Sequence, residues 1–205
     1  MTITGRFIAS HTASRIVLGF LVLFSPGVFS QGKKPETCFS CHGKAGTSTT
    51  ALTPSLGGQP SFFTVAQLFL FRDGRRGKSP SAMDAYAKPL SDADLQSLAA
   101  VFEKQPPPQP PAQARDPERF EKGRRLIEAR NCRVCHNPDY SGREQMPRLG
   151  NQREDYLLKA MRDYQSGQRI GYGSATMPEE LAGLGDADLA AIAHFLAHLP
   201  RPAKR

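Results

Sequence analysis

The spacing of apolar residues along the chain predicts helices and no strands. One helix is expected over residues 154–165, where apolar positions at i, i+1, i+4, i+5 and i+8 from Tyr156 fall on one face. Another is expected over residues 186–199, where the apolar positions from Leu189 keep the i, i+3, i+4, i+7 spacing and Pro200 follows the helix end. The pattern therefore predicts an all-α fold.

Capping residues predict two further helices. Asp116 is a suitable N-cap and Pro117 a suitable first residue for a helix over 118–130. Ser91 is expected to cap a helix whose apolar face begins at Leu95 and repeats the spacing found after Leu189.

The same series of features occurs twice, at an offset of 93 or 94 positions throughout. Each copy contains C-x-x-C-H, then P-x-L-G-x-Q, then an aromatic segment ending F/Y-x-x-G-x-R, then a methionine, then L-x-D-x-D-L. The first residues of these five features, given for the first copy and then the second, are Cys38 and Cys132, Pro54 and Pro147, Phe71 and Tyr164, Met83 and Met177, and Leu90 and Leu184. An ordered set of this kind indicates a tandem duplication of one domain of about 80 residues.

A proline-rich segment separates the two copies. Five of the seven residues at 105–111 are proline, a composition typical of a semi-rigid polyproline II spacer. We therefore expect a first domain over 31–104, a linker over 105–115 and a second domain over 116–200.

The beginning of the chain has the features of a secretory signal peptide. Arg6 and Arg15 give a positive region, residues 16–24 are a short apolar run, and residues 28–30 offer small side chains near a cleavage point. Cleavage is expected after residue 30, which predicts a periplasmic protein. An uncleaved N-terminal anchor is the alternative, and it leaves membrane association possible.

The charge balance argues against nucleic acid as a partner. The chain has 27 Lys and Arg against 19 Asp and Glu, a formal charge of +8, and removal of the two arginines of the signal leaves about +6. No stripe of basic residues appears. A weakly basic surface is compatible with docking to acidic proteins.

The C-x-x-C-H motif is the attachment signature of c-type haem. Two thiols three positions apart on a helical turn can reach the two vinyl groups along one haem edge, and the adjacent histidine then ligates the iron. All four cysteines of the chain are used in this way. We therefore expect two haem c groups, tethered by Cys38, Cys41, Cys132 and Cys135, with His42 and His136 as proximal ligands.

A C-x-x-C pair can also belong to a zinc site or to a redox-active thiol pair. A zinc ribbon has its two pairs about 15–20 residues apart, so that four ligands meet at one metal. The pairs here lie much farther apart, and each has its own histidine. A thioredoxin-like redox pair follows a strand in a βαβ setting, which this sequence does not show.

Met83 and Met177 are the expected distal ligands. They occupy the same place in both copies, in predicted loops just before a helix, and a loop methionine can place its thioether over the far face of a haem. The alternative is that both only pack. Met161 corresponds to Leu68 and Met146 to Thr53, so these two methionines are expected to pack rather than bind iron.

His194 and His198 compete for the distal position, but their counterparts in the first copy are Ala100 and Lys104. We interpret both as surface or packing residues. Methionine and histidine together fill both axial positions of an iron and raise its potential, which favours electron transfer over catalysis. No Ser/His/Asp set, P-loop or dinucleotide fingerprint appears.

With these motifs in this order, each copy resembles a class I cytochrome c domain, and residues 36–200 resemble the dihaem cytochrome c4 family. The resemblance implies a periplasmic one-electron carrier in a respiratory or oxidative chain, soluble or membrane-associated, with a terminal oxidase among its possible acceptors. The haem subunit of flavocytochrome c is similar in its two-domain plan. The alternative function is therefore the electron-transfer subunit of a periplasmic dehydrogenase.

Two finer predictions come from comparing the copies. The carbonyls of Pro54 and Pro147 are placed to accept hydrogen bonds from His42 and His136, although these prolines could simply shape a turn. Phe62 and Phe69 lie on an apolar face, with Val65 and Ala66 between them, that is mainly polar in the second copy. We expect this face to be buried against the second domain or a partner, unless residues 31–37 or an uncleaved signal cover it.

Overall fold

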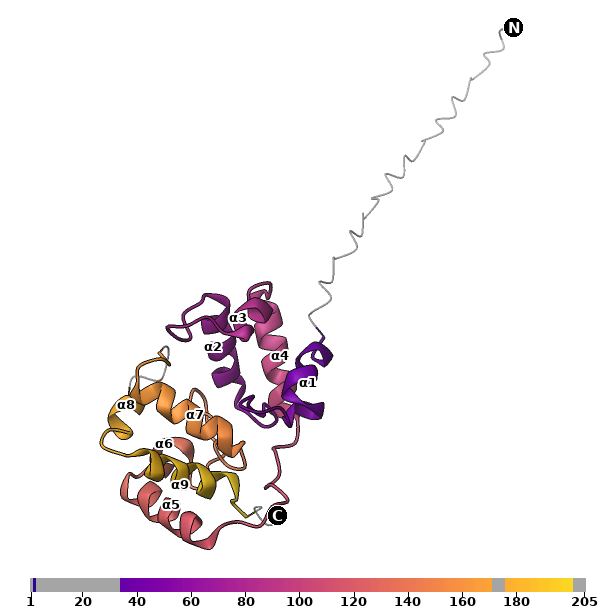
Figure 1. Ribbon diagram of the computed structural model, residues 1–205. Helices are drawn as coiled ribbons and strands as arrows, with labels where there is room; N and C mark the ends of the chain where they lie inside the picture. The colour runs from indigo at the N-terminus through magenta and orange to yellow at the C-terminus, as the bar shows by residue number, and fades with distance from the viewer. Residues whose placement is uncertain (1, 3–33, 171–175, 201–205) are drawn as a thin grey trace. The chain divides into compact units, whose positions relative to one another are not determined.

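The computed structural model describes residues 2, 34–170 and 176–200, and the predicted signal peptide lies outside these residues apart from Thr2. The first repeat contains α1 (Glu36–His42), the short 3₁₀ helix η1 (Lys44–Gly46), α2 (Ser61–Arg72), α3 (Ala82–Ala87) and α4 (Asp92–Lys104). The second contains α5 (Pro117–Ala129), α6 (Arg133–His136), α7 (Glu154–Gln165), α8 (Met177–Glu180) and α9 (Asp186–Ala197) (Figure 1). The described residues form no β-strand, as expected for an all-α fold.

In the first repeat, α4 packs against α2 and supplies most of the buried apolar side chains. Leu95, Leu98 and Phe102 of α4 are each at most 3% exposed. Phe102 meets the edge of Phe39 from α1, with ring centroids 6.0 Å apart. This contact joins the last helix to the helix that carries the first C-x-x-C-H motif.

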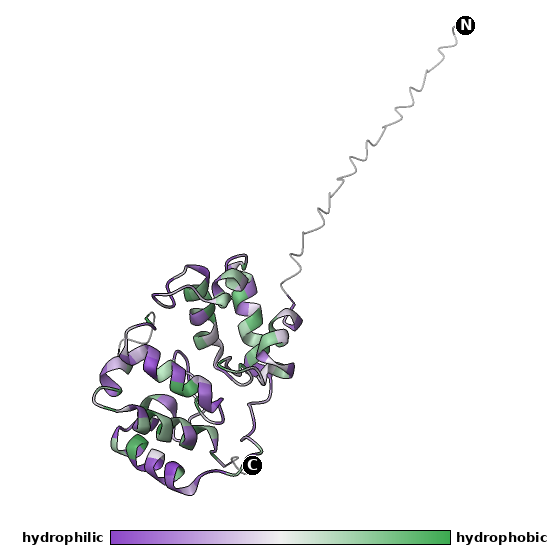
Figure 2. Cartoon of the chain, in the orientation of Figure 1, coloured by the Kyte–Doolittle hydropathy of each residue, from purple (hydrophilic) through white to green (hydrophobic). Residues whose placement is uncertain are grey.

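In the second repeat, α9 lies between α5 and α7 and contacts both. It is the most apolar helix of this repeat (Figure 2), and Leu189, Ala193 and Leu196 are almost fully buried. A side chain at Gly123 of α5 would place its Cβ 2.1 Å from the carbonyl oxygen of Ala191. Glycine at this position therefore lets α5 approach α9 closely.

Both predicted N-caps are confirmed. The Asp116 side chain accepts hydrogen bonds from the backbone of Glu118 and Arg119, and Ser91 accepts from Asp94. Helix α7 has the predicted bounds, whereas α9 ends two residues before the predicted limit.

The prediction that Met83 and Met177 lie in loops is wrong. Met83 is the second residue of α3, and Met177 is the first residue of α8. Helix α3 is short but has a complete capping box, in which Ser81 accepts from the backbone and Asp84 bonds back to the Ser81 N–H. Helix α8 is shorter still and has proline in its first turn.

The segment between the repeats leaves α4 in an extended conformation, with φ −68° and ψ 149° at Gln105. It then passes over the loop of the first repeat that contains Gly57 and Gly58. A Cβ at Gly57 would lie 2.4 Å from the carbonyl oxygen of Pro106, and one at Gly58 would lie 3.2 Å from the Pro107 side chain. The two glycines therefore make room for the linker.

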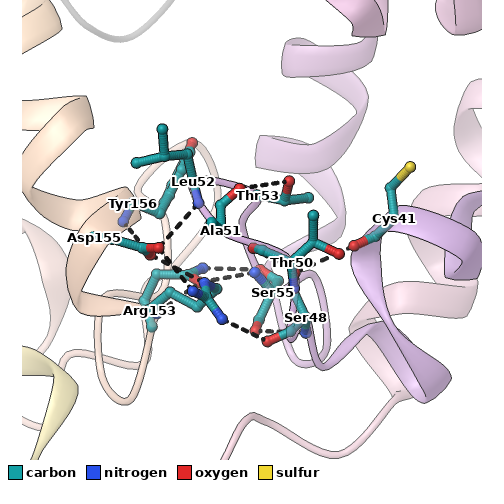
Figure 3. Close-up of polar contacts among 11 residues, drawn as sticks. Cys41, Ser48, Thr50, Ala51, Leu52, Thr53, Ser55, Arg153, Asp155 and Tyr156 are labelled. Atoms are coloured by element: carbon teal, nitrogen blue, oxygen red, sulfur yellow. Dashed lines mark hydrogen bonds and ion pairs between the residues drawn. The ribbon is translucent and has the colours of Figure 1, made fainter.

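The two repeats contact each other through their loops. The backbone N–H of Leu52 donates to Asp155 at 3.0 Å, and Arg153 reaches the carbonyl of Ser48 at 3.4 Å (Figure 3). The Lys78 N–H donates to the carbonyl of Gln168 at 3.0 Å beside an isolated bridge between Gly77 and Arg169. These contacts join segments that lie about 90–105 positions apart in the sequence.

The second repeat does not bury the apolar face of α2. Phe62 and Phe69 are 53% and 41% exposed, and Arg72 lies over the Phe69 ring at 5.0 Å. Of the two alternatives for this face, burial against the second domain is therefore wrong, and burial against a partner stays a prediction. Within the described part of the chain, no helix is both long and apolar enough to cross a membrane.

Candidate haem sites

One cavity of about 1430 Å³ reaches both C-x-x-C-H motifs. Its lining includes all the residues predicted to hold haem: Cys38, Cys41, His42, Met83, Cys132, Cys135, His136 and Met177. The rest of the wall is largely apolar and includes Phe63 and Leu68 in the first repeat and Leu157 and Ile192 in the second. The structure thus brings together residues that the sequence separates by more than 40 positions within each repeat.

Both histidines predicted as proximal ligands contact the predicted proline carbonyls. His42 Nδ1 lies 2.8 Å from the Pro54 oxygen, and His136 Nδ1 lies 2.9 Å from the Pro147 oxygen. A carbonyl can only accept, so Nδ1 carries the proton and donates. Each ring is 5% exposed, and burial lowers the pKa of both imidazoles although the hydrogen bond to proline opposes that shift. Both rings are therefore neutral, with Nε2 as the nitrogen able to bind a metal.

The two cysteines of each pair differ in exposure. Burial raises the pKa of Cys38, and it raises the pKa of Cys132 to about 11. Cys41 and Cys135, the second thiol of each pair, are exposed. Within residues 34–170 and 176–200, the cysteines form no group of three or more metal ligands, the arrangement that a structural zinc ion requires.

The methionines differ in their surroundings. Met177 packs against the buried core of the second repeat, and Met83 is half-buried beside the cavity. Met161 is 7% exposed within the same core, which confirms that it is a packing residue.

Sequence reasoning missed a pair of arginines, of which Arg169 is buried and Arg76 is partly buried. Arg76 and Arg169 line the cavity, and Arg76 Nε is buried with no hydrogen-bond partner in the described part of the chain. Burial, with the nearby charge of Arg169, lowers the pKa of Arg76 to about 10. Arg169 is 7% exposed and lies over the Tyr164 ring at 4.5 Å. The arginines end the F/Y-x-x-G-x-R motif of each copy, so the repeat itself contained the signal.

This arginine pair provides a test of whether haem fits. A buried guanidinium beside a second one whose buried Nε has no partner favours an anionic group between or next to them. Haem carries two propionates, and its macrocycle suits the apolar part of the wall. The cavity, the thiol pairs, the oriented imidazoles and the arginines therefore all fit haem c.

His194 and His198 do not line this cavity. The His194 ring is 4% exposed; Nε2 accepts from the backbone N–H of Asp116, and Nδ1 lies 2.8 Å from Glu154. Since Nε2 must accept, Nδ1 carries the proton and donates to the carboxylate. Arg119 donates to the same carboxylate at 2.6 Å. This network links α5, α7 and α9, and it confirms the interpretation of His194 as a packing residue.

Comparison with known proteins agrees with this geometry. The family model for cytochrome c matches residues 120–200, and the model for cytochrome c oxidase, cbb3-type, subunit III matches residues 32–100. Cytochrome c4 of Thiocapsa roseopersicina is 30% identical over 179 residues, which cover 82% of this chain and 90% of that protein. The chain belongs to the cytochrome c4 family. It is accordingly a two-domain cytochrome with two covalently bound haem c groups, and its activity is electron transfer rather than catalysis.

Other relatives of this cytochrome c4 extend the comparison. A thiosulfate dehydrogenase electron acceptor of Thiomonas intermedia is 31% identical over 194 residues, covering 89% of this chain and 88% of that protein. The structure of Acidithiobacillus ferrooxidans cytochrome c4 superposes with a TM-score of 0.69 at 25% identity, covering 80% of this chain and 99% of that one. A thiosulfate dehydrogenase from Marichromatium purpuratum matches with a TM-score of 0.68 at 26% identity, covering 80% of this chain and 36% of that one.

Proposed function

We propose that this cytochrome c4 is a periplasmic one-electron carrier whose two haems have the same types of axial ligand. Cys38 and Cys41 tether the first haem, which has His42 and Met83 as axial ligands. Cys132 and Cys135 tether the second, which has His136 and Met177. The domains that hold them extend over 31–104 and 116–200, behind a signal peptide at 1–30 and around a linker at 105–115.

The observation that carries the proposal is the matched orientation of the two proximal histidines. Each ring donates from Nδ1 to a proline carbonyl, at 2.8 and 2.9 Å, so that Nε2 is the nitrogen left for iron. A donated Nδ1 proton fixes the tautomer and raises the basicity of the ligating nitrogen. A methionine of the same repeat lines the same cavity in each case.

The bound haem supplies reversible transfer of one electron between the ferric and ferrous states. The chain supplies the surroundings. Phe63, Leu68, Leu157 and Ile192 exclude water with apolar side chains, and Arg76 and Arg169 provide the charge for the propionates. Methionine as the sixth ligand leaves no open position for oxygen or peroxide and raises the potential.

Replacing the distal methionines tests the ligand assignment. In the oxidised protein, Met83→Ala and Met177→Ala are each expected to halve the thioether-to-iron absorption band near the red edge of the visible spectrum. Met161→Leu is the control, because Met161 also lines the cavity yet corresponds to Leu68 in the first repeat. A full band in either alanine variant, or a halved band in the control, would contradict the assignment.

A second function is favoured by two of the relatives. Similarity to a thiosulfate dehydrogenase electron acceptor and to a thiosulfate dehydrogenase structure supports a role as the acceptor for a periplasmic dehydrogenase. A free carrier would instead pass electrons to acceptors such as a terminal oxidase. Affinity purification from the native host separates the two functions: an acceptor subunit should retain a catalytic partner in fixed stoichiometry, and a free carrier should elute alone.

A further inference from the structure

Two buried glutamines form reciprocal contacts between the repeats. Gln152 donates from Nε2 to the carbonyl of Ser55 and accepts at Oε1 from the Ser55 N–H, both at 2.8 Å. Gln59 donates from Nε2 to the carbonyl of Arg148 and accepts at Oε1 from the Arg148 N–H, both at 3.0 Å. We call these contacts the glutamine clamps. The glutamines are 3% and 4% exposed.

Each clamp acts on the peptide group that holds a proximal histidine. The peptide between Pro54 and Ser55 accepts from His42 through its carbonyl and donates to Gln152 through its N–H. The peptide between Pro147 and Arg148 accepts from His136 and donates to Gln59 in the same way. Thus each histidine is linked through one amide to a glutamine of the other repeat.

Amide hydrogen bonds in such a chain strengthen one another. A peptide whose N–H donates to a buried amide oxygen becomes a better acceptor at its carbonyl, which strengthens each hydrogen bond by about 10–30%. A better acceptor draws the Nδ1 proton farther from the imidazole and makes Nε2 more basic. A more basic proximal ligand stabilises ferric iron over ferrous iron and lowers the reduction potential.

We propose that Gln152 tunes the haem held by His42 and that Gln59 tunes the haem held by His136. Both are positioning residues, since they act on the iron through a peptide and an imidazole. The inference rests on the proposed function only in taking the two histidines as iron ligands. It gives the interface between the repeats a part in setting the two potentials, in addition to holding the domains together.

Two simpler roles of the glutamines, a purely structural one and a purely local one, predict different outcomes. If the clamps only hold the domains together, loss of either one should affect both haems alike. Both glutamines also line the cavity, so a purely local effect of a glutamine should fall on the haem of its own repeat. Only tuning through the peptide makes the effect cross from one repeat to the other.

Gln59→Met and Gln152→Met in the haem-loaded protein form a matched pair. Each removes two hydrogen bonds between the repeats, keeps the side-chain length and changes no charge, and Gln152→Met also removes the bond that Gln152 Oε1 accepts from the Arg153 N–H at 3.0 Å within the second repeat. The potentials are measured by redox titration followed by NMR, with the signals of each haem assigned from Met83→Ala and Met177→Ala. Gln152→Met should raise the potential of the His42 haem and leave the other unchanged, and Gln59→Met should do the reverse.

The nitrogen-15 shifts of the two proximal Nδ1 atoms, measured with labelled histidine, provide a second readout. The shift should change for His42 in Gln152→Met and for His136 in Gln59→Met. Shifts confined to the variant's own repeat, equal shifts at both haems, or none would overturn the inference. If the proposed function itself were wrong, the unsubstituted protein would lack the methionine band. If a variant does not fold, the more conservative Gln→Asn pair, whose shorter amides cannot reach the peptides, provides the same comparison.

Discussion

At the residue scale, the sequence predicts the site where chemistry demands a fixed spacing. The thiols, the histidine and the proline carbonyl all lie within about 20 positions of one another in each repeat, so local geometry decides their contacts. Arg76 and Arg169 could not be assigned in this way. Their motif is visible in the sequence, but the burial of Arg169 and of the Arg76 Nε atom appears only once the chain is folded.

Removal of the Arg76 charge should lower the reduction potential of the protein. Arg76 is partly buried and lines the cavity, and a cation beside a haem favours the reduced state, which carries one positive charge fewer, by on the order of 1 kcal/mol at the effective dielectric of a protein interior. We therefore expect Arg76→Gln to give a lower potential in a redox titration. Arg76→Lys, which keeps the charge, is the control. An unchanged or raised potential in the glutamine variant would show that Arg76 does not face the haem.

At the element scale, long helices were predicted well and short ones were not. Helix α7 has enough turns for its apolar face to be visible in the sequence, and α5 has both its cap and its proline. Helices α3 and α8 have at most six residues, too few to show periodicity. Their cap signals, Ser81 with Asp84 and the proline after Met177, were the only local indications, and both methionines were therefore expected in loops.

The cap of α5 should make the second repeat sensitive to acid. The backbone N–H groups of Arg119 and Glu118 lower the pKa of Asp116. A carboxyl with a lowered folded-state pKa stabilises the fold above its unfolded pKa, and this contribution is lost as pH falls through the folded value. We therefore expect the natural chain to be thermally more stable than Asp116→Asn above the pKa range of the carboxyl. This difference in thermal stability of the second repeat should shrink as the pH falls.

Asparagine is the informative replacement here, because it caps helices about as well as aspartate but has no titrating proton. Asp116→Ala, which lacks a cap, should be less stable than both at neutral pH. A constant difference between the natural chain and Asp116→Asn across the acid range would show that the cap does not titrate.

At the scale of the whole molecule, the two repeats differ in how much core they build from their own side chains. Among the described residues, the buried cluster around Leu189 and Ile127 belongs entirely to the second repeat. The buried apolar residues of the first repeat lie mainly on α4. The sequence shows two copies of one domain, and this imbalance in the buried core appears only in the folded structure.

The first repeat should therefore depend more on its haem. Cys38→Ser with Cys41→Ser removes attachment in the first repeat, and Cys132→Ser with Cys135→Ser removes it in the second. Limited proteolysis should cut the first repeat of the former protein faster than the second repeat of the latter, because an unfilled small core opens more readily. Equal rates of cutting would mean that the two repeats rely on haem to the same degree.

The reciprocal glutamine clamps make the contact between the repeats isologous, the type of interface found in dimers with two-fold symmetry. In a true homodimer, one substitution in such an interface appears on both sides at once. In this chain it appears on one side only. Ser55 and Arg148 occupy equivalent places yet differ in charge and size. The chain thus has the geometry of a symmetric dimer, while each of its two iron sites is free to change alone.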